Sequence, residues 1–235
     1  MKFEAVLFDC DGVLVDSEPI ANQILRDMLQ ERGWNLTLAE CMGIFIGKTV
    51  QDEAALIEQK TGHPVTQEWL AGFRGRRNTA LVQGLTAIAN IHDALAQIHA
   101  LFAGRIACAS GADRFKVEFM LRKLQLIDYF DGRIFSGYEM PRSKPFPDVY
   151  LAAAAALGAD PQRCAVVEDT VIGVTAGAAA GATVFAYLPA STTHVDATAL
   201  RRAGAHHVFA DMAELPGLLE GIRGNAQAQL TQLTQ

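Results

Sequence analysis

Short apolar segments recur along this chain in alternation with helical patterns, and that alternation limits the fold more strongly than any other feature. Strands are predicted at Phe3–Phe8, Arg105–Ala109, Arg133–Phe135, Cys164–Glu168, Thr183–Tyr187 and His207–Ala210. Most are separated by helical patterns that end in glycine, and Gly158 and Gly181 are the expected helix stops before the next strand. Strands that alternate with helices indicate a parallel sheet covered by helices on both faces. We therefore predict an α/β fold whose core is a Rossmann-like, doubly wound parallel sheet.

Residues 17–85 break this alternation, because they carry successive helical patterns without a convincing strand. Helix starts are predicted at Ser17, Thr37, Thr49 and Thr66. We expect an inserted helical cap over residues 17–85, with residues 1–16 and 86–235 forming the catalytic core. Because the insertion follows the first strand, we expect it to lie over the carboxyl edge of the sheet, as a lid that supplies selectivity.

Composition and charge narrow the class of protein. Half of the 235 residues are apolar, enough to bury a sizeable core, and the net charge of −6 disfavours general binding to nucleic acid or anionic membranes. The cysteines show no metal-ligand spacing and are expected to be buried thiols in a reducing compartment. We find no charged leader and no long apolar stretch, so we predict a cytoplasmic protein. No pattern implies a protein partner.

Polar side chains stand where several predicted strands end. Asp9 and Asp11 come directly after the first apolar segment, and Gly12 lets the chain turn tightly beside them. The corresponding residues at or after later strands are Ser110, Lys144, Glu168 and Asp169. Ligands bind along the carboxyl edge of open α/β sheets, so we expect these side chains to converge there.

Each of these residues alone has an ordinary structural interpretation. Asp-x-Asp-Gly is common in turns, Ser110 suits a helix cap, and Lys144 suits a solvated loop. Glu168 and Asp169 suit a helix N-terminus. Together they are harder to explain, because four carboxylates on one edge repel one another unless a cation offsets them, and such oxygen ligands favour Mg²⁺. Mg²⁺ with a lysine and a hydroxyl is a phosphate-binding environment.

These motifs, in this order, resemble the four motifs of the haloacid dehalogenase superfamily of phosphotransferases. They are Asp9-Cys10-Asp11-Gly12, Ser110, Lys144-Pro145 and Glu168-Asp169. The place of the insertion resembles the subgroup with a helical cap, and the resemblance spans nearly the whole chain. It implies phosphate chemistry, because members that displace halide work without Mg²⁺ and lack the second aspartate.

The resemblance also implies a role for each residue. Asp9 would be the nucleophile that forms an aspartyl-phosphate, and Asp11 the general acid and base. Ser110 and Lys144 would hold the phosphoryl oxygens. The implied Mg²⁺ ligands are Asp9, the main-chain carbonyl of Asp11, Asp169 and, directly or through water, Glu168.

The expected partner is a small-molecule phosphate ester, a phosphorylated sugar or sugar acid, with 6-phosphogluconate as one candidate. In the cap, Lys48, Arg74 and Arg77 are candidates to bind a second anionic group, although an exposed cationic helix face explains each of them equally well. One alternative is a phosphosugar mutase resembling β-phosphoglucomutase. It is disfavoured because Ala21, Val50 and Asp113 stand where that enzyme has a histidine and basic residues. The other alternative is a catalytically silent binding protein, which the intact acid set disfavours.

Overall fold

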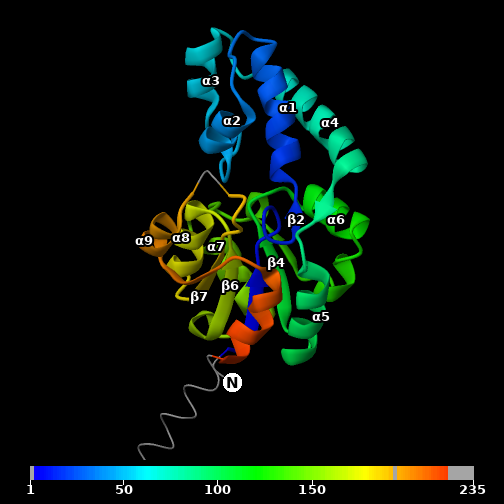
Figure 1. Cartoon of the computed structure of the whole chain (residues 1–235), viewed down its shortest axis with the longest axis vertical. Coiled ribbons are helices and arrows are strands. Elements are labelled where there is room, and N and C mark those ends of the chain that lie inside the picture. Colours follow the sequence, from blue (N-terminus) through cyan, green and yellow to red (C-terminus); the bar gives the residue numbers. More distant parts are fainter. Residues whose placement is uncertain (1–2, 193–194, 222–235) are drawn as a thin grey trace, which may run out of the picture.

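A computed structural model describes residues 3–192 and 195–221 and shows a parallel sheet beneath a group of helices (Figure 1). The sheet has the strand order β5-β4-β1-β6-β7-β8. Its strands are β1 (Ala5–Phe8), β4 (Ile106–Ser110), β5 (Ile134–Ser136), β6 (Cys164–Glu168), β7 (Thr183–Tyr187) and β8 (Ala205–Phe209). All six predicted strands are present, so the predicted fold class is confirmed. The prediction for the last strand began two residues too late.

Helices cover both faces of the sheet, because successive strand residues point to opposite sides. Val6 and Phe8 of β1 join one buried apolar cluster, and Ala5 and Leu7 join the other. One face packs against α5 (Ile91–Leu101) and α6 (Arg114–Lys123); the other packs against α7 (Asp148–Ala156), α8 (Val171–Ala179) and α9 (Ala197–Ala203) (Figure 1). Four short 3₁₀ helices complete the core: Ile127–Phe130, Gly137–Glu139, Pro161–Arg163 and Met212–Glu214.

The inserted segment forms four helices with an apolar cluster of their own. They are α1 (Glu18–Gln30), α2 (Leu38–Phe45), α3 (Ala54–Thr61) and α4 (Gln67–Gly84). The buried side chains of this cluster are Leu25, Met28, Leu29, Cys41, Phe45, Ile57 and Phe73. This cluster is separate from the two clusters of the sheet, so the insertion packs as a unit of its own. It forms a helical cap above the carboxyl edge of the strands (Figure 1).

Three of the four predicted helix starts are confirmed, at Ser17, Thr37 and Thr66. Thr37 forms the predicted capping box with Glu40, and the hydroxyl of Thr66 accepts a hydrogen bond from the amide of Trp69. The prediction for Thr49 is wrong, because its hydroxyl accepts from the amide of Asp52 at 3.1 Å in a turn and α3 begins later. Ser17 directly precedes α1 as predicted, with Pro19 in the first turn, while its hydroxyl donates to Asp11 and not to the amides of the helix.

A two-stranded antiparallel ladder, absent from the sequence-based prediction, joins the two segments that enter and leave the cap. It pairs β2 (Val15–Asp16) with β3 (Thr86–Ala87). Two residues are too few to produce an alternating apolar pattern, so these strands leave no signal in the sequence. No helix among the described residues is long and apolar enough to cross a membrane. All four cysteines are buried free thiols, as predicted.

Candidate active site

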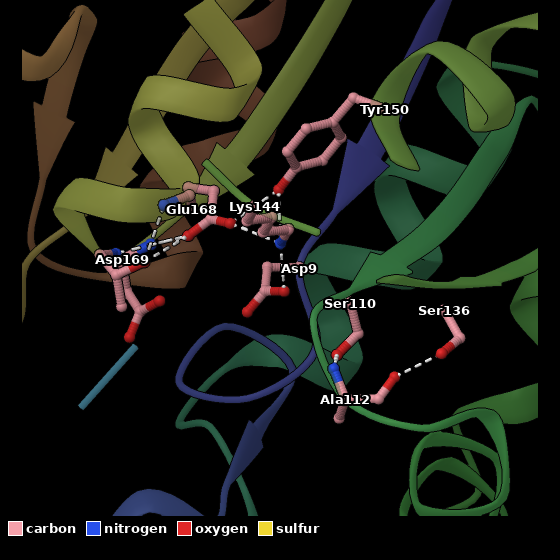
Figure 2. A network of polar contacts seen from close by, with 10 residues as sticks. Asp9, Ser110, Ala112, Ser136, Lys144, Tyr150, Glu168 and Asp169 are labelled. Carbon is pink, nitrogen blue, oxygen red and sulfur yellow. Dashed lines mark hydrogen bonds and ion pairs between the residues drawn. The ribbon is translucent and has the colours of Figure 1, made fainter. Parts of the chain in front are cut away.

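The predicted site residues meet where the strand order changes direction. The central strand β1 pairs with β4 on one side and β6 on the other, which makes its carboxyl end a switch point of the topology. Asp9 follows β1, Ser110 ends β4, and Glu168 ends β6. Figure 2 shows these three side chains with Lys144 and Asp169 in one group, although they come from segments far apart in sequence.

Lys144 lies between Asp9 and Glu168 and contacts both (Figure 2). Its ammonium nitrogen lies 2.7 Å from Asp9 Oδ1, 2.6 Å from Glu168 Oε1 and 3.0 Å from the hydroxyl of Tyr150. All three N–H donors of the ammonium therefore have partners. Burial alone would lower the pKa of Lys144, but the carboxylates of Asp9 and Glu168 hold it well above its ordinary value.

Asp9 is buried, and one of its oxygens accepts no hydrogen bond from the described residues. Burial raises the pKa of Asp9, the cation of Lys144 opposes that rise, and the net result is a pKa of about 7. Oδ1 accepts from Lys144, whereas Oδ2 has no hydrogen-bond partner among the residues that the structure describes. The main-chain amide of Asp9 donates to the carbonyl of Val167 at 3.0 Å, which fixes the residue at the strand end.

Glu168 is fully surrounded by donors. Besides Lys144, its carboxylate accepts from the Tyr150 hydroxyl at 2.7 Å and from the amides of Asp169 at 3.0 Å and Thr170 at 3.4 Å. Gly173 on α8 lies so close that an added Cβ would be 1.8 Å from Glu168 Oε1. The absence of a side chain at Gly173 therefore makes room for the carboxylate.

Replacing Gly173 with alanine is expected to lower the free energy of unfolding by about 1–3 kcal/mol, because the buried, fully hydrogen-bonded carboxylate has nowhere to move. Urea unfolding measures the change. The matched control is Gly43→Ala on α2, where an added Cβ would meet no atom within 4 Å. That control is expected to raise stability by about 0.5–1 kcal/mol, the usual gain for alanine in a helix. Equal gains in both variants would show that Glu168 shifts at no cost.

Asp169 has a buried carboxylate oxygen, Oδ1, that accepts no hydrogen bond from residues 3–192 and 195–221. Burial, followed by the charges of Glu168 and Asp9, raises the pKa of Asp169 well above the usual range. Gly12, at φ 79°, approaches Asp169 so closely that a Cβ there would lie 2.0 Å from Oδ2.

Three of the acidic residues are arranged suitably for a metal ion. Asp9, Glu168 and Asp169 each offer an oxygen, and these oxygens all lie within 4.8 Å of one another. A hard divalent cation would satisfy the unpartnered oxygen and offset the crowded charge. The donor set therefore fits the predicted Mg²⁺.

Asp11 faces a different group of residues. Ser17 donates a hydrogen bond to its Oδ1, and the ammonium of Lys116 lies 2.7 Å from the same oxygen. Burial alone would raise the pKa of Asp11, but Lys116, Ser17 and Arg77 together lower it below its ordinary value. Lys116, on the first turn of α6, was missed from the sequence. A cation in the first turn of a helix is unfavourable beside the positive end of the helix dipole. This unfavourable position was the one sign in the sequence that Lys116 has a special role.

Ser110 is buried at the end of β4 and is held by the loop that follows. Its oxygen accepts a hydrogen bond from the amide of Ala112 at 3.0 Å, and the Ser136 hydroxyl donates to the carbonyl of Ala112 at 2.7 Å (Figure 2). The oxygen of Ser110 acts as acceptor in that bond, so its own proton remains available to a ligand.

A cavity of about 520 Å³ lies between the cap and the sheet edge. Asp11, Lys144 and Glu168 line it from the core. The predicted cap cations line it from the other side: Lys48, Arg74 and Arg77. Lys48 forms an ion pair with Glu53 at 2.8 Å, whereas Arg77 donates to the neutral amide of Asn78 at 3.0 Å.

Comparisons with known proteins agree with this architecture. The 6-phosphogluconate phosphatase of Escherichia coli is 32% identical over 185 residues, which cover 78% of this chain and 82% of that protein. Hexitol phosphatase B of the same organism is 31% identical over 182 residues, covering 75% and 79%. A solved hydrolase from Deinococcus radiodurans with bound phosphate and sodium is 37% identical, with a TM-score of 0.77 over 94% of this chain and 96% of that chain.

The family match covers most of the chain. A family model described as haloacid dehalogenase-like hydrolase matches residues 3–181, which include all the predicted site residues. This match confirms the predicted family, and with the phosphatase relatives it confirms the predicted enzyme class. The chain therefore belongs to the haloacid dehalogenase-like hydrolases.

Proposed function

We propose that this protein is a Mg²⁺-dependent phosphatase that hydrolyses small phosphorylated sugars or sugar acids through an aspartyl-phosphate on Asp9. The observation that carries the proposal is the state of the Asp9 carboxylate. Lys144 binds one oxygen at 2.7 Å, and the other oxygen, at the switch point of the sheet, has no hydrogen-bond partner in the part of the chain that the structure describes. A buried, oriented carboxylate of this kind is prepared for in-line attack on phosphorus.

In the first half of the proposed reaction, Asp9 Oδ2 forms a bond to phosphorus as the bond from phosphorus to the ester oxygen breaks. Asp11 donates a proton to that leaving oxygen. Lys116 and Ser17 favour the ionised form of Asp11 in the free enzyme. The negative phosphoryl group of an arriving substrate would raise the pKa of Asp11 and so favour the protonated form.

In the second half, Asp11 takes a proton from a water molecule that attacks phosphorus, and the bond between Asp9 and phosphorus breaks. Phosphate leaves, Asp9 is again a carboxylate, and Asp11 again carries the proton that it donates in the first half. Ser110 would donate its free proton to a phosphoryl oxygen. Lys144, whose donors are occupied, would contribute its charge and keep Asp9 oriented.

Mg²⁺ would be held by Asp9, Asp169 and the main-chain carbonyl of Asp11, with Glu168 as a direct or water-mediated ligand. The ion would neutralise the phosphoryl charge that otherwise repels the Asp9 carboxylate. The unpartnered Asp169 Oδ1 supports this assignment. The dense hydrogen bonding of Glu168 favours the water-mediated role for that residue.

The cap would select the substrate. We place the cap at residues 17–85 and the core at residues 1–16 and 86–235, with the β2–β3 ladder next to the junction. Lys48, Arg74 and Arg77 would bind the part of the substrate remote from the phosphate, and a sugar acid suits these cations. The sequence relatives named for 6-phosphogluconate and hexitol phosphates support this class, and 6-phosphogluconate is the first compound to test.

Phosphate release is the test of this proposal. We expect release from one or more of 6-phosphogluconate, glucose 6-phosphate, β-glucose 1-phosphate and phosphoglycolate with Mg²⁺, and none after EDTA. Restored activity on adding Mg²⁺ back serves as the control for irreversible damage by the chelator. Conversion of β-glucose 1-phosphate into glucose 6-phosphate without free phosphate would contradict the proposal, as would release that EDTA leaves unchanged.

A further inference from the structure

Glu18 is a carboxylate in the wall of the cavity with no role in the reaction described above. It is the first residue of α1 and lines the same cavity as Asp11 and Lys144. The residue before it, Ser17, donates its hydroxyl hydrogen bond to Asp11. Glu18 therefore stands beside the acid that is proposed to protonate the leaving oxygen.

The carboxylate of Glu18 has hydrogen-bonding capacity left over. Its Oε2 accepts from the side-chain amide of Asn22 at 2.9 Å, and it forms no ion pair among the described residues. The two cations whose charges act on Glu18 form their hydrogen bonds with other side chains, Lys116 with Asp11 at 2.7 Å and Arg77 with Asn78 at 3.0 Å. A carboxylate accepts up to about four hydrogen bonds, so most of this capacity is unused by the protein.

Lys116, Asn22 and Arg77 offset the cost of burying the Glu18 charge only in part. Burial, and then the nearby charge of Asp11, raise its pKa to about 7. A polar group in such a position is stabilised when a ligand supplies hydrogen-bond donors. Hydroxyl groups are neutral donors, and they fit a place where a second anion would be repelled by Asp11.

The position of Glu18 is also fixed before any ligand arrives. Asn22 lies one turn along α1 on the same face, and its amide also donates to the Glu18 carbonyl at 3.0 Å. Asn22 is itself buried, and the thiol of Cys41 donates to its carbonyl oxygen at 3.5 Å. Two helices of the cap thus hold the acceptor in place, which lowers the entropic cost of binding.

We propose that Glu18 is a specificity-determining residue that accepts hydrogen bonds from substrate hydroxyl groups on the carbons next to the phosphate ester. The proposal rests on the phosphatase function proposed above and narrows its substrates to polyol and sugar phosphates. A site built to bind a hydroxyl group rejects the analogue that lacks it, because the partly buried acceptor then has one hydrogen bond fewer.

The test compares the wild-type enzyme with Glu18→Gln on glycerol phosphate, 6-phosphogluconate and propyl phosphate. Glycerol phosphate and propyl phosphate share a three-carbon chain but differ in their hydroxyl groups. We expect the substitution to lower kcat/KM for the two hydroxylated esters about 10-fold or more, mainly through KM, since hydrogen bonds to charged groups are the stronger ones. For propyl phosphate we expect a change within about twofold. Glutamine keeps the size of the side chain and the contact with Asn22.

The matched control is Glu31→Gln, at the other end of α1, whose exposed carboxylate pairs with Arg76 outside the cavity. It is expected to leave all three substrates unaffected. Equal losses on all three esters in Glu18→Gln would overturn the proposal, because they would indicate a role in folding or in orienting Asp11.

The proposal is separable from the phosphatase function. If the wild-type protein releases phosphate from no ester, calorimetric titration of glycerol phosphate and propyl phosphate replaces the assay. A preference for the hydroxylated ester that disappears in Glu18→Gln would still support the role of Glu18. Absence of any preference in the wild type would overturn it.

Discussion

Asp9→Asn is expected to abolish phosphate release, with a loss of at least ~10³-fold in kcat, because a carboxamide is not a nucleophile toward phosphorus. The fold should survive this change. Asparagine has nearly the same shape, and Lys144 keeps Glu168 and Tyr150 as partners when Asp9 loses its charge. The free energy of unfolding should therefore change by about 1 kcal/mol or less.

Intact-protein mass spectrometry distinguishes the cause of the loss. The wild-type enzyme quenched in acid during turnover should carry a phosphoryl adduct, and Asp9→Asn should carry none. Asp93→Asn, an exposed carboxylate on the first turn of α5, is the control and should retain both turnover and the adduct. Substantial turnover by Asp9→Asn would exclude a covalent intermediate on this residue.

Lys144→Met is expected to have the largest effect on stability, a loss of about 3–5 kcal/mol, because it leaves two buried carboxylates without their cation. Glu168 is 1% exposed and Asp9 is 7% exposed, so water cannot replace the ammonium. Unfolding should be measured in EDTA, which prevents a divalent ion from taking over the role of the lysine. Turnover with Mg²⁺ should also fall sharply, since Asp9 loses the contact that orients it.

The double variant Lys144→Met with Glu168→Gln tests this explanation. Removing the charge that the lysine neutralised should restore part of the lost stability, an interaction that a double-mutant cycle measures. Lys123→Met at the end of α6 is the surface control, and it should lie within about 0.5 kcal/mol of the wild type. A double variant less stable than Lys144→Met would show that burial of charge is not the cause.

The core of the fold and the position of the candidate site were readable from the sequence. The strands are apolar segments bounded by turn residues, and their alternation with helices leaves few arrangements other than a doubly wound sheet. Once the sheet is parallel, residues that follow its strands must meet at one edge. Asp9, Ser110 and Glu168 follow from that rule without any knowledge of side-chain contacts.

The signals that failed were short or non-local. The β2–β3 ladder has two residues in each strand, too few for a period to show. Thr49 has the local chemistry of a helix cap, yet the chain uses it in a turn because tertiary packing determines where α3 begins. Tyr150 stands in an alanine-rich helix, and nothing local indicates that its hydroxyl meets Glu168 and Lys144.

The sheet, the presence of a cap and the identity of the acidic residues could be predicted from local patterns, because periodicity and strand ends are local properties of the chain. Which side chains touch depends on tertiary packing. Lys116 and Asp11, which are in contact, lie 105 positions apart in the sequence. Gly12 and Asp169, which also approach each other closely, come from distant parts of the core sequence. Such contacts depend on how separate elements pack, so the orientation, charge and accessibility of each carboxylate emerge only when the chain has folded.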